Sequence, residues 1–275
     1  MRKRTRNVAR ADRIALEWIA RTALALALAC VWPAGVAHAF EATSVHRFDN
    51  PSGMPAGVIR RGGALYGVVR GRDFGQPNEE FCGIVFKLEK NGAEWTRLVL
   101  HRFDTNGGGC QPYGELVFGS DGALYGTTRT GGLDNCPQGA LGTQCGLVFK
   151  LSAQPDPLPW TYSIIHRFSG GNQGFYPSAG LVWGLDGSRY GTTAGFCGSG
   201  GSTIYKLTPP EAGSTDWTHT VLRRGTYMFP PVAFGSDGAL YGADTGCGSD
   251  RGWVFRLRAC AIASESGMLP GPVVM

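Results

Sequence analysis

The stretch Gly119-Ser-Asp-Gly-Ala-Leu-Tyr-Gly-Thr-Thr128 decides the fold of this chain because it recurs along the sequence. Similar stretches stand at Leu185–Thr193 and Gly235–Gly242, and a shorter one stands at Gly62–Gly67. The four copies share one tyrosine each: Tyr66, Tyr125, Tyr190 and Tyr241. These tyrosines follow one another at steps of 59, 65 and 51 residues. Spacings in this range indicate a repeat architecture, in which each unit buries its apolar surface against the next.

Each repeat contains four short apolar segments, which in the second repeat are Gly114–Phe118, Ala123–Thr128, Gly146–Leu151 and Trp160–Phe168. They are rich in β-branched and aromatic residues and are bounded by Gly, Pro, Asn and Asp, which is typical of strands. The Asp-Gly pair within Ser120–Gly122 predicts a tight hairpin whose two central residues both take positive φ. No sustained helical pattern follows the first 39 residues.

Four antiparallel strands repeated four times predict an all-β protein, a β-propeller of four four-stranded antiparallel blades. The fourth repeat stops after Trp253–Leu257 and has no final strand. The segment Thr43–Phe48 carries a fragment of that missing strand sequence. We therefore expect this mature N-terminal strand to pair beside Trp253–Leu257 in the last blade and to close the ring without an exposed edge.

The first 39 residues have the order of a secretory signal peptide: a basic lead, an apolar run over Thr22–Trp32 and a small-residue cleavage site at Ala37–Ala39. That run is too short to span a bilayer as a transmembrane anchor. We expect an exported, extracellular or periplasmic protein with no transmembrane span in the mature chain. Residues 40–258 then form a single domain, and residues 259–275 form a flexible tail. The repeats cover about 49–103, 104–168, 169–224 and 225–258, the last together with 43–48.

The charge of the chain belongs to this N-terminal lead. Residues 1–39 hold seven basic and two acidic residues, a net charge of +5, which equals the net charge of the whole chain. The mature chain is therefore neutral by count, so the sequence gives no support for nucleic-acid binding.

The order of the segments resembles a known repeat. Ser-Asp-Gly-Ala-Leu-Tyr-Gly-Thr-Thr, a glycine-rich loop, Gly-x-Val-Phe-Lys-Leu, Leu-His-Arg-Phe and Pro-x-Ala-Gly-Leu-Val are similar to the GloVer tandem repeat, best over Pro112–Leu151 and Ile165–Thr193. The resemblance covers about Thr43–Leu257. It implies an exported, propeller-like protein of unknown biochemical role and carries no catalytic residue over to this chain. Four repeats are fewer than expected for this type, and the C-terminus shows no obvious sorting motif.

Seven cysteines follow residue 39, and export makes disulfides the expected state. Six of them fall in loops expected on one face of the blades, and we expect the pairs Cys136–Cys145, Cys82–Cys110 and Cys197–Cys247, although spacing alone does not fix connectivity. An odd count leaves at least one thiol free or paired with another chain, and Cys260 is the candidate for a covalent dimer. No Cys-x-x-Cys pair is present, so we expect no metal site and no cofactor.

Long loops held by disulfides suggest a surface kept for binding. The candidate binding residues on this loop face are Arg70, Arg72, Asp73, Glu79, Glu80, Arg129, Asp134, Asn135, Asp244, Asp250 and Arg251. The alternative interpretation is that these are ordinary solvated loop charges. His46, His101 and His166 recur at one strand position, where we interpret them as structural edge residues, and the repeated Asp before Gly has a sufficient backbone reason in the hairpin.

Three functions fit these patterns. The leading hypothesis is a secreted, non-catalytic repeat protein whose loop face binds a glycan, a cell-surface polymer or a protein. The second is a propeller hydrolase or lyase acting on a polysaccharide, with acidic and basic residues supplied by separate blades. The third is a structural or assembly module. No catalytic motif for nucleophilic, metal-dependent or phosphate chemistry is present in the sequence, so the catalytic residues are unknown.

Overall fold

A computed structural model describes residues 44–48, 54–71, 82–104, 107–132, 145–155, 159–195, 201–225, 231–247 and 251–258 of the chain. The chain divides into two units, Met1–Ser44 and Val45–Met275, and all the strands belong to the second. The predicted signal peptide and C-terminal tail lie outside the described residues. Within the ranges given above, the chain has no helix with the length and hydrophobicity needed to cross a bilayer.

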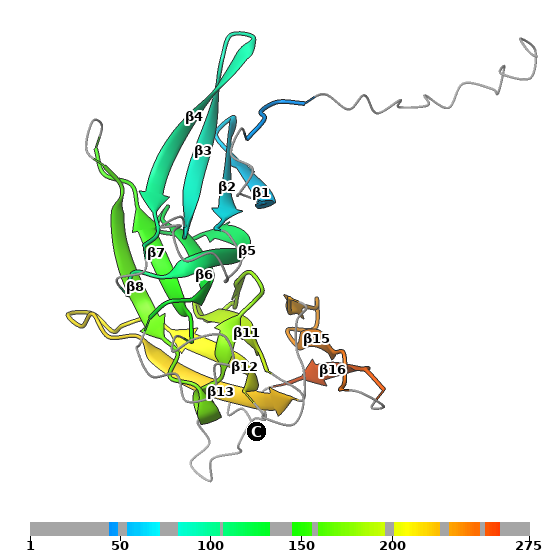
Figure 1. Cartoon of the computed structure of the whole chain (residues 1–275). Coiled ribbons are helices and arrows are strands. Elements are labelled where there is room, and N and C mark those ends of the chain that lie inside the picture. The colour runs from blue at the N-terminus through cyan, green and yellow to red at the C-terminus, as the bar shows by residue number, and fades with distance from the viewer. Residues whose placement is uncertain are drawn as a thin grey trace, which may run out of the picture. The chain divides into compact units, whose positions relative to one another are not determined.

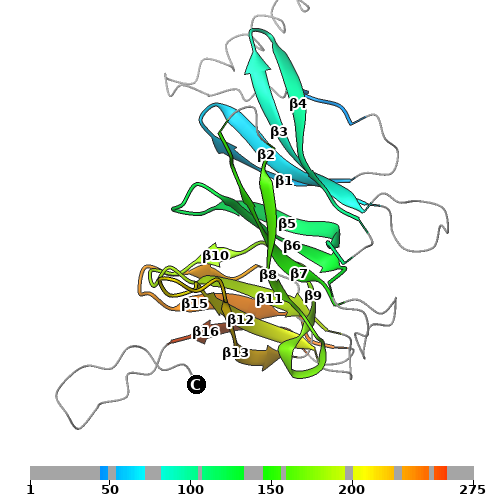
Figure 2. The same ribbon diagram turned by 90° about the vertical axis from the view of Figure 1, so that its left-hand side faces the viewer.

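The strands form four antiparallel sheets (Figures 1 and 2). The first sheet contains β1 (Pro55–Arg61), β2 (Ala64–Arg70), β3 (Gly83–Asn91) and β4 (Glu94–Arg102). The second contains β5 (Cys110–Phe118), β6 (Leu124–Thr130), β7 (Leu147–Ser152) and β8 (Thr161–Arg167). The third contains β9 (Phe175–Pro177), β10 (Val182–Trp183), β11 (Arg189–Ala194), β12 (Ser202–Thr208) and β13 (Thr218–Gly225), after a short 3₁₀ turn at Gly171–Gln173. The fourth contains β14 (Ala233–Phe234), β15 (Leu240–Asp244) and β16 (Trp253–Leu257).

The all-β prediction and the repeated antiparallel order are confirmed, because consecutive strands pair antiparallel in the first, second and fourth sheets and from β10 to β13 in the third. The sheets also share one register. The repeated tyrosine of the second strand faces the basic residue of the third strand in every repeat: Tyr66 and Lys87, Tyr125 and Lys150, Tyr190 and Lys206, Tyr241 and Arg256. The third sheet departs from the four-strand pattern because β9 also pairs with β11.

The predicted closure by the N-terminal strand is wrong for this structure. Residues Val45–Phe48 do not form a strand, and β16 is an edge strand of the fourth sheet that pairs with β15. The ring of Phe48 instead packs against Phe86 of β3, at a centroid distance of 5.0 Å. The segment is held by apolar contact with the first sheet, and no backbone hydrogen bond joins Val45–Phe48 to β16 among the described residues.

The hairpin turns also differ from the prediction. In the second, third and fourth sheets only the glycine of the Asp-Gly pair has positive φ: 77° at Gly122, 75° at Gly187 and 72° at Gly238. The aspartate keeps ordinary φ because its carboxylate accepts the backbone N–H two residues on, as Asp121 does from Ala123 at 3.2 Å. The first hairpin has the predicted pattern, with positive φ at both Gly62 and Gly63.

The core lies at the boundaries between successive sheets. Leu116, Leu124 and Phe149 of the second sheet are packed with Tyr66 and Phe103 of the first. The glycine that follows each repeated tyrosine is required there, because a Cβ on Gly126 would collide with the ring of Phe149. The equivalent residues Gly67, Gly191 and Gly242 would collide with Phe86, Tyr205 and Phe255. The glycine of each Tyr-Gly pair is therefore required by the close approach of an aromatic ring from the third strand.

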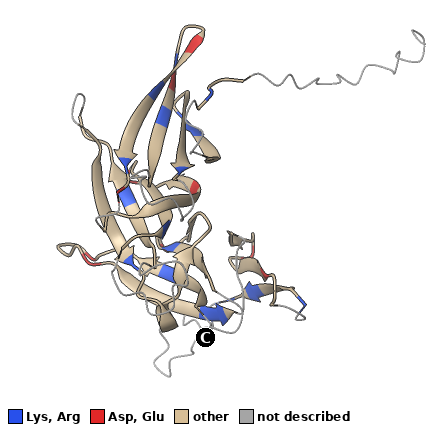
Figure 3. Cartoon of the chain, in the orientation of Figure 1, with Lys and Arg blue, Asp and Glu red and all other residues tan. Residues whose placement is uncertain are grey.

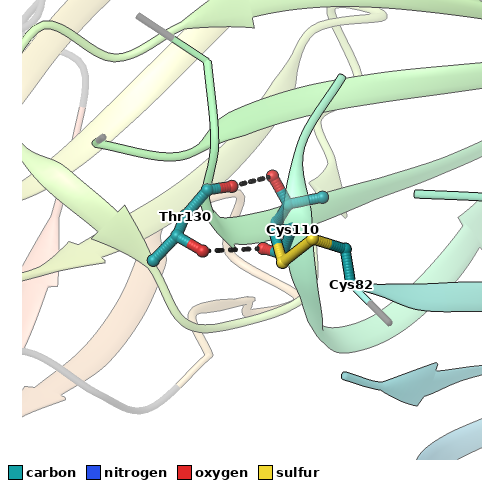
Figure 4. Close-up of a disulfide and its surroundings, with 4 residues drawn as sticks. Cys82, Cys110 and Thr130 are labelled. Carbon is teal, nitrogen blue, oxygen red and sulfur yellow. Dashed lines mark hydrogen bonds between the residues drawn. A yellow bond between two sulfur atoms is a disulfide. The ribbon is translucent and has the colours of Figure 1, made fainter. Parts of the chain in front are cut away.

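The predicted disulfide between Cys82 and Cys110 is confirmed. It joins the residue just before β3 to the first residue of β5, so it ties the first sheet to the second. Thr130 of β6 holds Cys110 by donating its Oγ1 hydrogen to the Cys110 carbonyl at 3.2 Å (Figure 4). Cys145 and Cys247 are also disulfide-bonded. The predicted pairs Cys136–Cys145 and Cys197–Cys247 stay predictions, because Cys136 and Cys197 lie outside the described residues, as does Cys260.

Removing the disulfide should destabilise the protein. The two cysteines are 28 residues apart, and closing a loop of this length restricts the unfolded chain by about 3.5 kcal/mol. We expect the Cys82→Ala, Cys110→Ala double variant to lose about that much free energy of unfolding in urea titration. An unchanged urea midpoint and slope would contradict a stabilising role for this bond.

Candidate functional site

Four of the eleven predicted loop-face residues lie in the described part of the chain: Arg70, Arg129, Asp244 and Arg251. The other seven lie outside it: Arg72, Asp73, Glu79, Glu80, Asp134, Asn135 and Asp250. Asp244, at the end of β15, is buried with 2% exposure and its carboxylate accepts a hydrogen bond from the backbone N–H of Gly246. Its prediction as a surface ligand is wrong, because it holds a turn. Arg251 is exposed just before β16.

Arg70 and Arg129 come together around two tyrosines. Each arginine stands four residues after the repeated tyrosine of its own sheet, so both lie at the loop end of a second strand. The Cζ of Arg70 lies 3.6 Å from the centroid of the Tyr113 ring. The Cζ of Arg129 lies 6.0 Å from the same ring and 5.6 Å from the ring of Tyr176. Two guanidinium groups from adjacent sheets therefore share one aromatic ring.

The tyrosines sit in or beside strained backbone. Gln111 and Tyr176 are the non-glycine residues with positive φ in the described part of the chain, at 57° and 56°. Each precedes a proline, and each donates its backbone N–H at 2.8 Å to the carbonyl of a cysteine, Cys82 or Cys145, in the preceding sheet. Left-handed backbone at a non-glycine residue costs on the order of 1–3 kcal/mol, and strain of this kind is concentrated at functional sites. The hydrogen bonds from Gln111 and Tyr176 to the preceding sheet hold this backbone in place, so Tyr113 and Tyr176 lie at boundaries between sheets.

The cluster formed by Arg70, Arg129, Tyr113 and Tyr176, named here the arginine–tyrosine cluster, is half-buried at both arginines and at Tyr113. Its cations keep part of their surface in water, and the Tyr113 ring that they share is also partly exposed. Guanidinium groups bind carboxylate and sulfate oxygens through paired N–H donors. The arrangement can therefore hold an anionic group beside an apolar, ring-shaped one.

Sequence reasoning predicted the two arginines but missed the two tyrosines. A sequence signal that could have found the tyrosines is a glutamine or tyrosine followed by proline near the start of a repeat. It occurs in Gln111-Pro-Tyr113 and in Tyr176-Pro177. These residues were not singled out because they do not align strictly with one another. Only the inter-sheet hydrogen bonds show that both stretches serve as the same connection.

A second feature lies at the opposite, hairpin end of the strands, where the turn aspartates hold the repeated tyrosine and the basic residue of the third strand. Asp121 accepts hydrogen bonds from the Tyr125 hydroxyl at 2.7 Å and from Lys150 at 2.8 Å. Asp186 binds Tyr190 and Lys206 in the same way, and Asp237 binds Tyr241 and Arg256. Figure 3 colours the Lys and Arg residues of the ribbon blue and the Asp and Glu residues red.

These contacts stabilise the carboxylate form of the aspartates. Burial works to raise the pKa of Asp121, but the hydrogen bonds from Lys150, Tyr125 and the Ala123 amide lower that pKa below its usual value. The same balance lowers the pKa of Asp186, where Lys206 is the main opposing partner. An ionised aspartate that is bound by a basic residue and a tyrosine stabilises the hairpin. We therefore interpret each of these turn aspartates as a structural residue rather than as an acid catalyst.

A pocket of about 450 Å³ opens between the third and fourth sheets. Its walls are mainly apolar, with Trp183, Tyr190, Phe234 and Leu257 among them, and Asp186, Lys206 and Arg258 supply polar groups. The sequence pattern gives no sign of this pocket. At the two preceding boundaries the tryptophan just before the fourth strand packs against the repeated tyrosine, Trp160 on Tyr66 and Trp217 on Tyr125, each at 6.3 Å between ring centroids. The fourth repeat has no such strand.

Comparison with known proteins adds the following findings. No protein family and no curated protein matches the sequence. A luciferin-regenerating enzyme of known structure is similar with a TM-score of 0.46 and 16% identity, over 81% of this chain and 64% of that one. An α-L-arabinofuranosidase from Clostridium thermocellum is similar with a TM-score of 0.36 and 10% identity, over 81% of this chain and 94% of that one. This chain therefore spans slightly less than two thirds of the luciferin-regenerating enzyme, and these likenesses assign no activity to it.

Proposed function

We propose that this is an exported repeat protein that binds an anionic polysaccharide on its loop face, through the arginine–tyrosine cluster. The observation that carries the proposal is that Arg70 and Arg129, from two different sheets, contact the same Tyr113 ring. An acidic sugar residue presents a carboxylate or sulfate together with a ring face of C–H groups. Paired guanidinium groups bind the first and an aromatic ring packs on the second.

The neighbouring disulfide supports this role. Arg70 pairs in the sheet with Gly83, which follows Cys82, and Cys110 stands three residues before Tyr113. The bond between Cys82 and Cys110 therefore fixes the two strand ends that carry the closest contact of the cluster. Groups held in place before the ligand arrives lose less conformational entropy on binding, which strengthens affinity.

The same proposal treats the sheets as blades of a propeller and the chain as a GloVer-type exported repeat protein with a non-catalytic role. Equivalent aromatic contacts at two successive sheet boundaries support the blade interpretation. In the described part of the chain, no group of three or more His, Cys, Asp or Glu side chains is arranged to hold a metal ion.

The test is calorimetric titration with oligosaccharides of galacturonic acid, of sulfated glucosamine–uronate type and of neutral glucose. We expect the Arg70→Gln, Arg129→Gln double variant to bind the acidic oligosaccharides at least about tenfold more weakly, because each charged hydrogen bond contributes roughly 1.5–3 kcal/mol. We also expect added NaCl to weaken binding by the native chain, since salt screens exposed charges.

Arg61→Gln is the matched control. Arg61 packs on Phe118 with its Cζ 4.5 Å from the ring centroid, but it lies at the hairpin end of β1, away from the cluster. This variant should bind like the native chain. Equal binding of neutral and acidic oligosaccharides, or unchanged binding by the double variant, would contradict the proposal. Release of new reducing ends during the titration would support the polysaccharide-cleaving alternative instead.

A further inference from the structure

The fourth strand of the first sheet and that of the second sheet each end in the sequence His-Arg followed by Phe, and this end packs on the following sheet. Phe103, after β4, packs on Phe149 at 5.2 Å, and Phe168, after β8, packs on Tyr205 at 5.1 Å between ring centroids. The histidine two residues earlier stacks on a ring of the next sheet, His101 on Tyr162 at 4.0 Å. These aromatic contacts are the ones by which the end of a fourth strand packs on the following sheet.

The segment Val45–Phe48, named here the N-terminal segment, makes the same contacts on the first sheet. Phe48 packs on Phe86, which occupies the place of Phe149 and Tyr205. The Cζ of Arg97, which matches Tyr162 in register, lies 5.7 Å from the Phe48 ring. The centroids of His46 and Phe48 are 4.9 Å apart, close to the 4.7 Å of His101 and Phe103. The N-terminal segment therefore lies where the last strand of a preceding sheet would lie.

The N-terminal segment covers only part of the face of the first sheet on which it lies. Val58 occupies the place of Leu116, because each packs beside the glycine after the repeated tyrosine of its own sheet, Gly67 or Gly126. Leu116 is covered by the first sheet and is 3% exposed, whereas Val58 is 52% exposed. Trp95, which matches Trp160 in the repeat, has no repeated tyrosine from a preceding sheet packed on it in the described part of the chain.

The fourth sheet is incomplete in the complementary way. It has three strands, β16 is its edge, and Trp253 and Val254 on that edge are 54% and 80% exposed. The pocket at its boundary with the third sheet lies where Trp160 and Trp217 pack at the earlier boundaries. One end of the described chain thus carries a strand segment without its sheet, and the other end carries a sheet without that strand.

We propose that a second copy of this chain joins these ends, so that the N-terminal segment of each copy completes the β16 edge of the other in a closed head-to-tail dimer. The structure favours a second copy over the chain's own segment, because both parts are described and no hydrogen bond pairs them.

The register and the closure follow from the repeats. Val85 pairs with His101 and Val148 pairs with His166, so Val254 of one copy lies opposite His46 of the other. Head-to-tail contacts form either a ring or an open filament. Two copies with four sheets each make a ring of eight sheets, within the range of roughly four to eight blades found in propellers.

Analytical ultracentrifugation of the purified exported chain tests this proposal. We expect a dimer that dissociates on dilution, and a Val254→Arg variant whose dissociation constant rises at least about tenfold, because an unpaired charge would be buried in the junction. Leu98→Arg is the control: Leu98 is exposed on the opposite face of β4 from Arg97 and should leave the dimer intact. A Cys260→Ser variant should also stay dimeric, since the junction needs no disulfide.

A photo-reactive benzoylphenylalanine at position 254 provides a second readout that does not depend on the stability of the Val254→Arg variant. Irradiation should give a product of dimer mass in which position 254 is linked to the peptide that contains Val45–Phe48. A product of monomer mass with the same link would mean that the chain closes on its own segment, and it would overturn the proposal. A native chain that sediments as a monomer, or as an open series of larger species, would overturn it as well.

Discussion

Lowering the pH from 7 to 4.5 is expected to reduce the free energy of unfolding by about 4 kcal/mol, because two stacked histidines must stay neutral in the folded protein. His166 of β8 and His219 of β13 lie across the boundary between the second and third sheets, with ring centroids 4.2 Å apart and planes 4° from parallel. Burial lowers the pKa of His166 to about 3, and the charge of His219 adds to that shift. Burial lowers the pKa of His219 to about 4.

The sign and the size follow from linkage. Both folded pKa values lie below the usual value of about 6.5, so the unfolded chain binds more protons than the folded protein between pH 6.5 and about 4. Stability is fully present above pH 6.5 and falls as the pH decreases through this window. Two such groups would lose about 5 kcal/mol between pH 6.5 and 4.5, and we reduce this to about 4 because both rings are partly exposed to solvent.

The matched variant is His219→Tyr. At the preceding boundary the equivalent partner of a histidine is a tyrosine, since His101 stacks on Tyr162 at 4.0 Å. The variant should therefore keep the stacked geometry while it removes one titrating group, and we expect the pH dependence between 7 and 4.5 to fall to about half. Urea unfolding at several pH values measures both proteins. Parallel curves for the native chain and His219→Tyr would show that the histidine pair does not control acid stability, since the carboxylates are common to both.

Replacing Phe168 by alanine is the second change with a large expected effect. Phe168 has no exposed surface and packs its ring on Tyr205 at 5.1 Å and on His219 at 5.7 Å. The strand that precedes it belongs to the second sheet and the rings that it contacts belong to the third, so the loss affects the boundary between sheets. We expect the free energy of unfolding at pH 7 to fall by about 3–5 kcal/mol, the usual range for a buried phenylalanine.

Phe48→Ala is the internal comparison for this measurement. Phe48 makes the same type of contact on the first sheet, but it is only partly buried and no sheet covers it in the single chain. At protein concentrations where the chain is monomeric, we expect a loss of about 1–1.5 kcal/mol, less than half of that for Phe168. Equal losses for the two variants would mean that the first sheet is as well covered as the third, contrary to the exposed Val58.

The candidate site shows where sequence reasoning was sufficient and where it ended. The loop-face hypothesis singled out Arg70 and Arg129 because both follow a second strand at a loop end, and the structure places both of them near the Tyr113 ring. It treated Asp244 in the same way, although that residue is buried in a turn. Position after a strand predicts the face of the molecule, but it does not predict whether a side chain turns outward or caps the backbone. The neighbours of each side chain decide that, and they come from distant parts of the sequence.

The sequence by itself determined the strands, their antiparallel order and the positions of the hairpin turns, because these depend on local composition and on period. The Cys82–Cys110 pair was predicted from the loops that carry the two cysteines, but the structure was needed to establish it. Tertiary structure alone decided that Tyr113 is shared by two arginines, that a pocket opens beside the fourth sheet and that the N-terminal segment lies on the first sheet. Each of these depends on contact between sheets, where the shapes of side chains far apart in the chain must fit together. A sequence pattern predicts the strands that meet at such a boundary, but it does not predict the size or shape of a cavity between them.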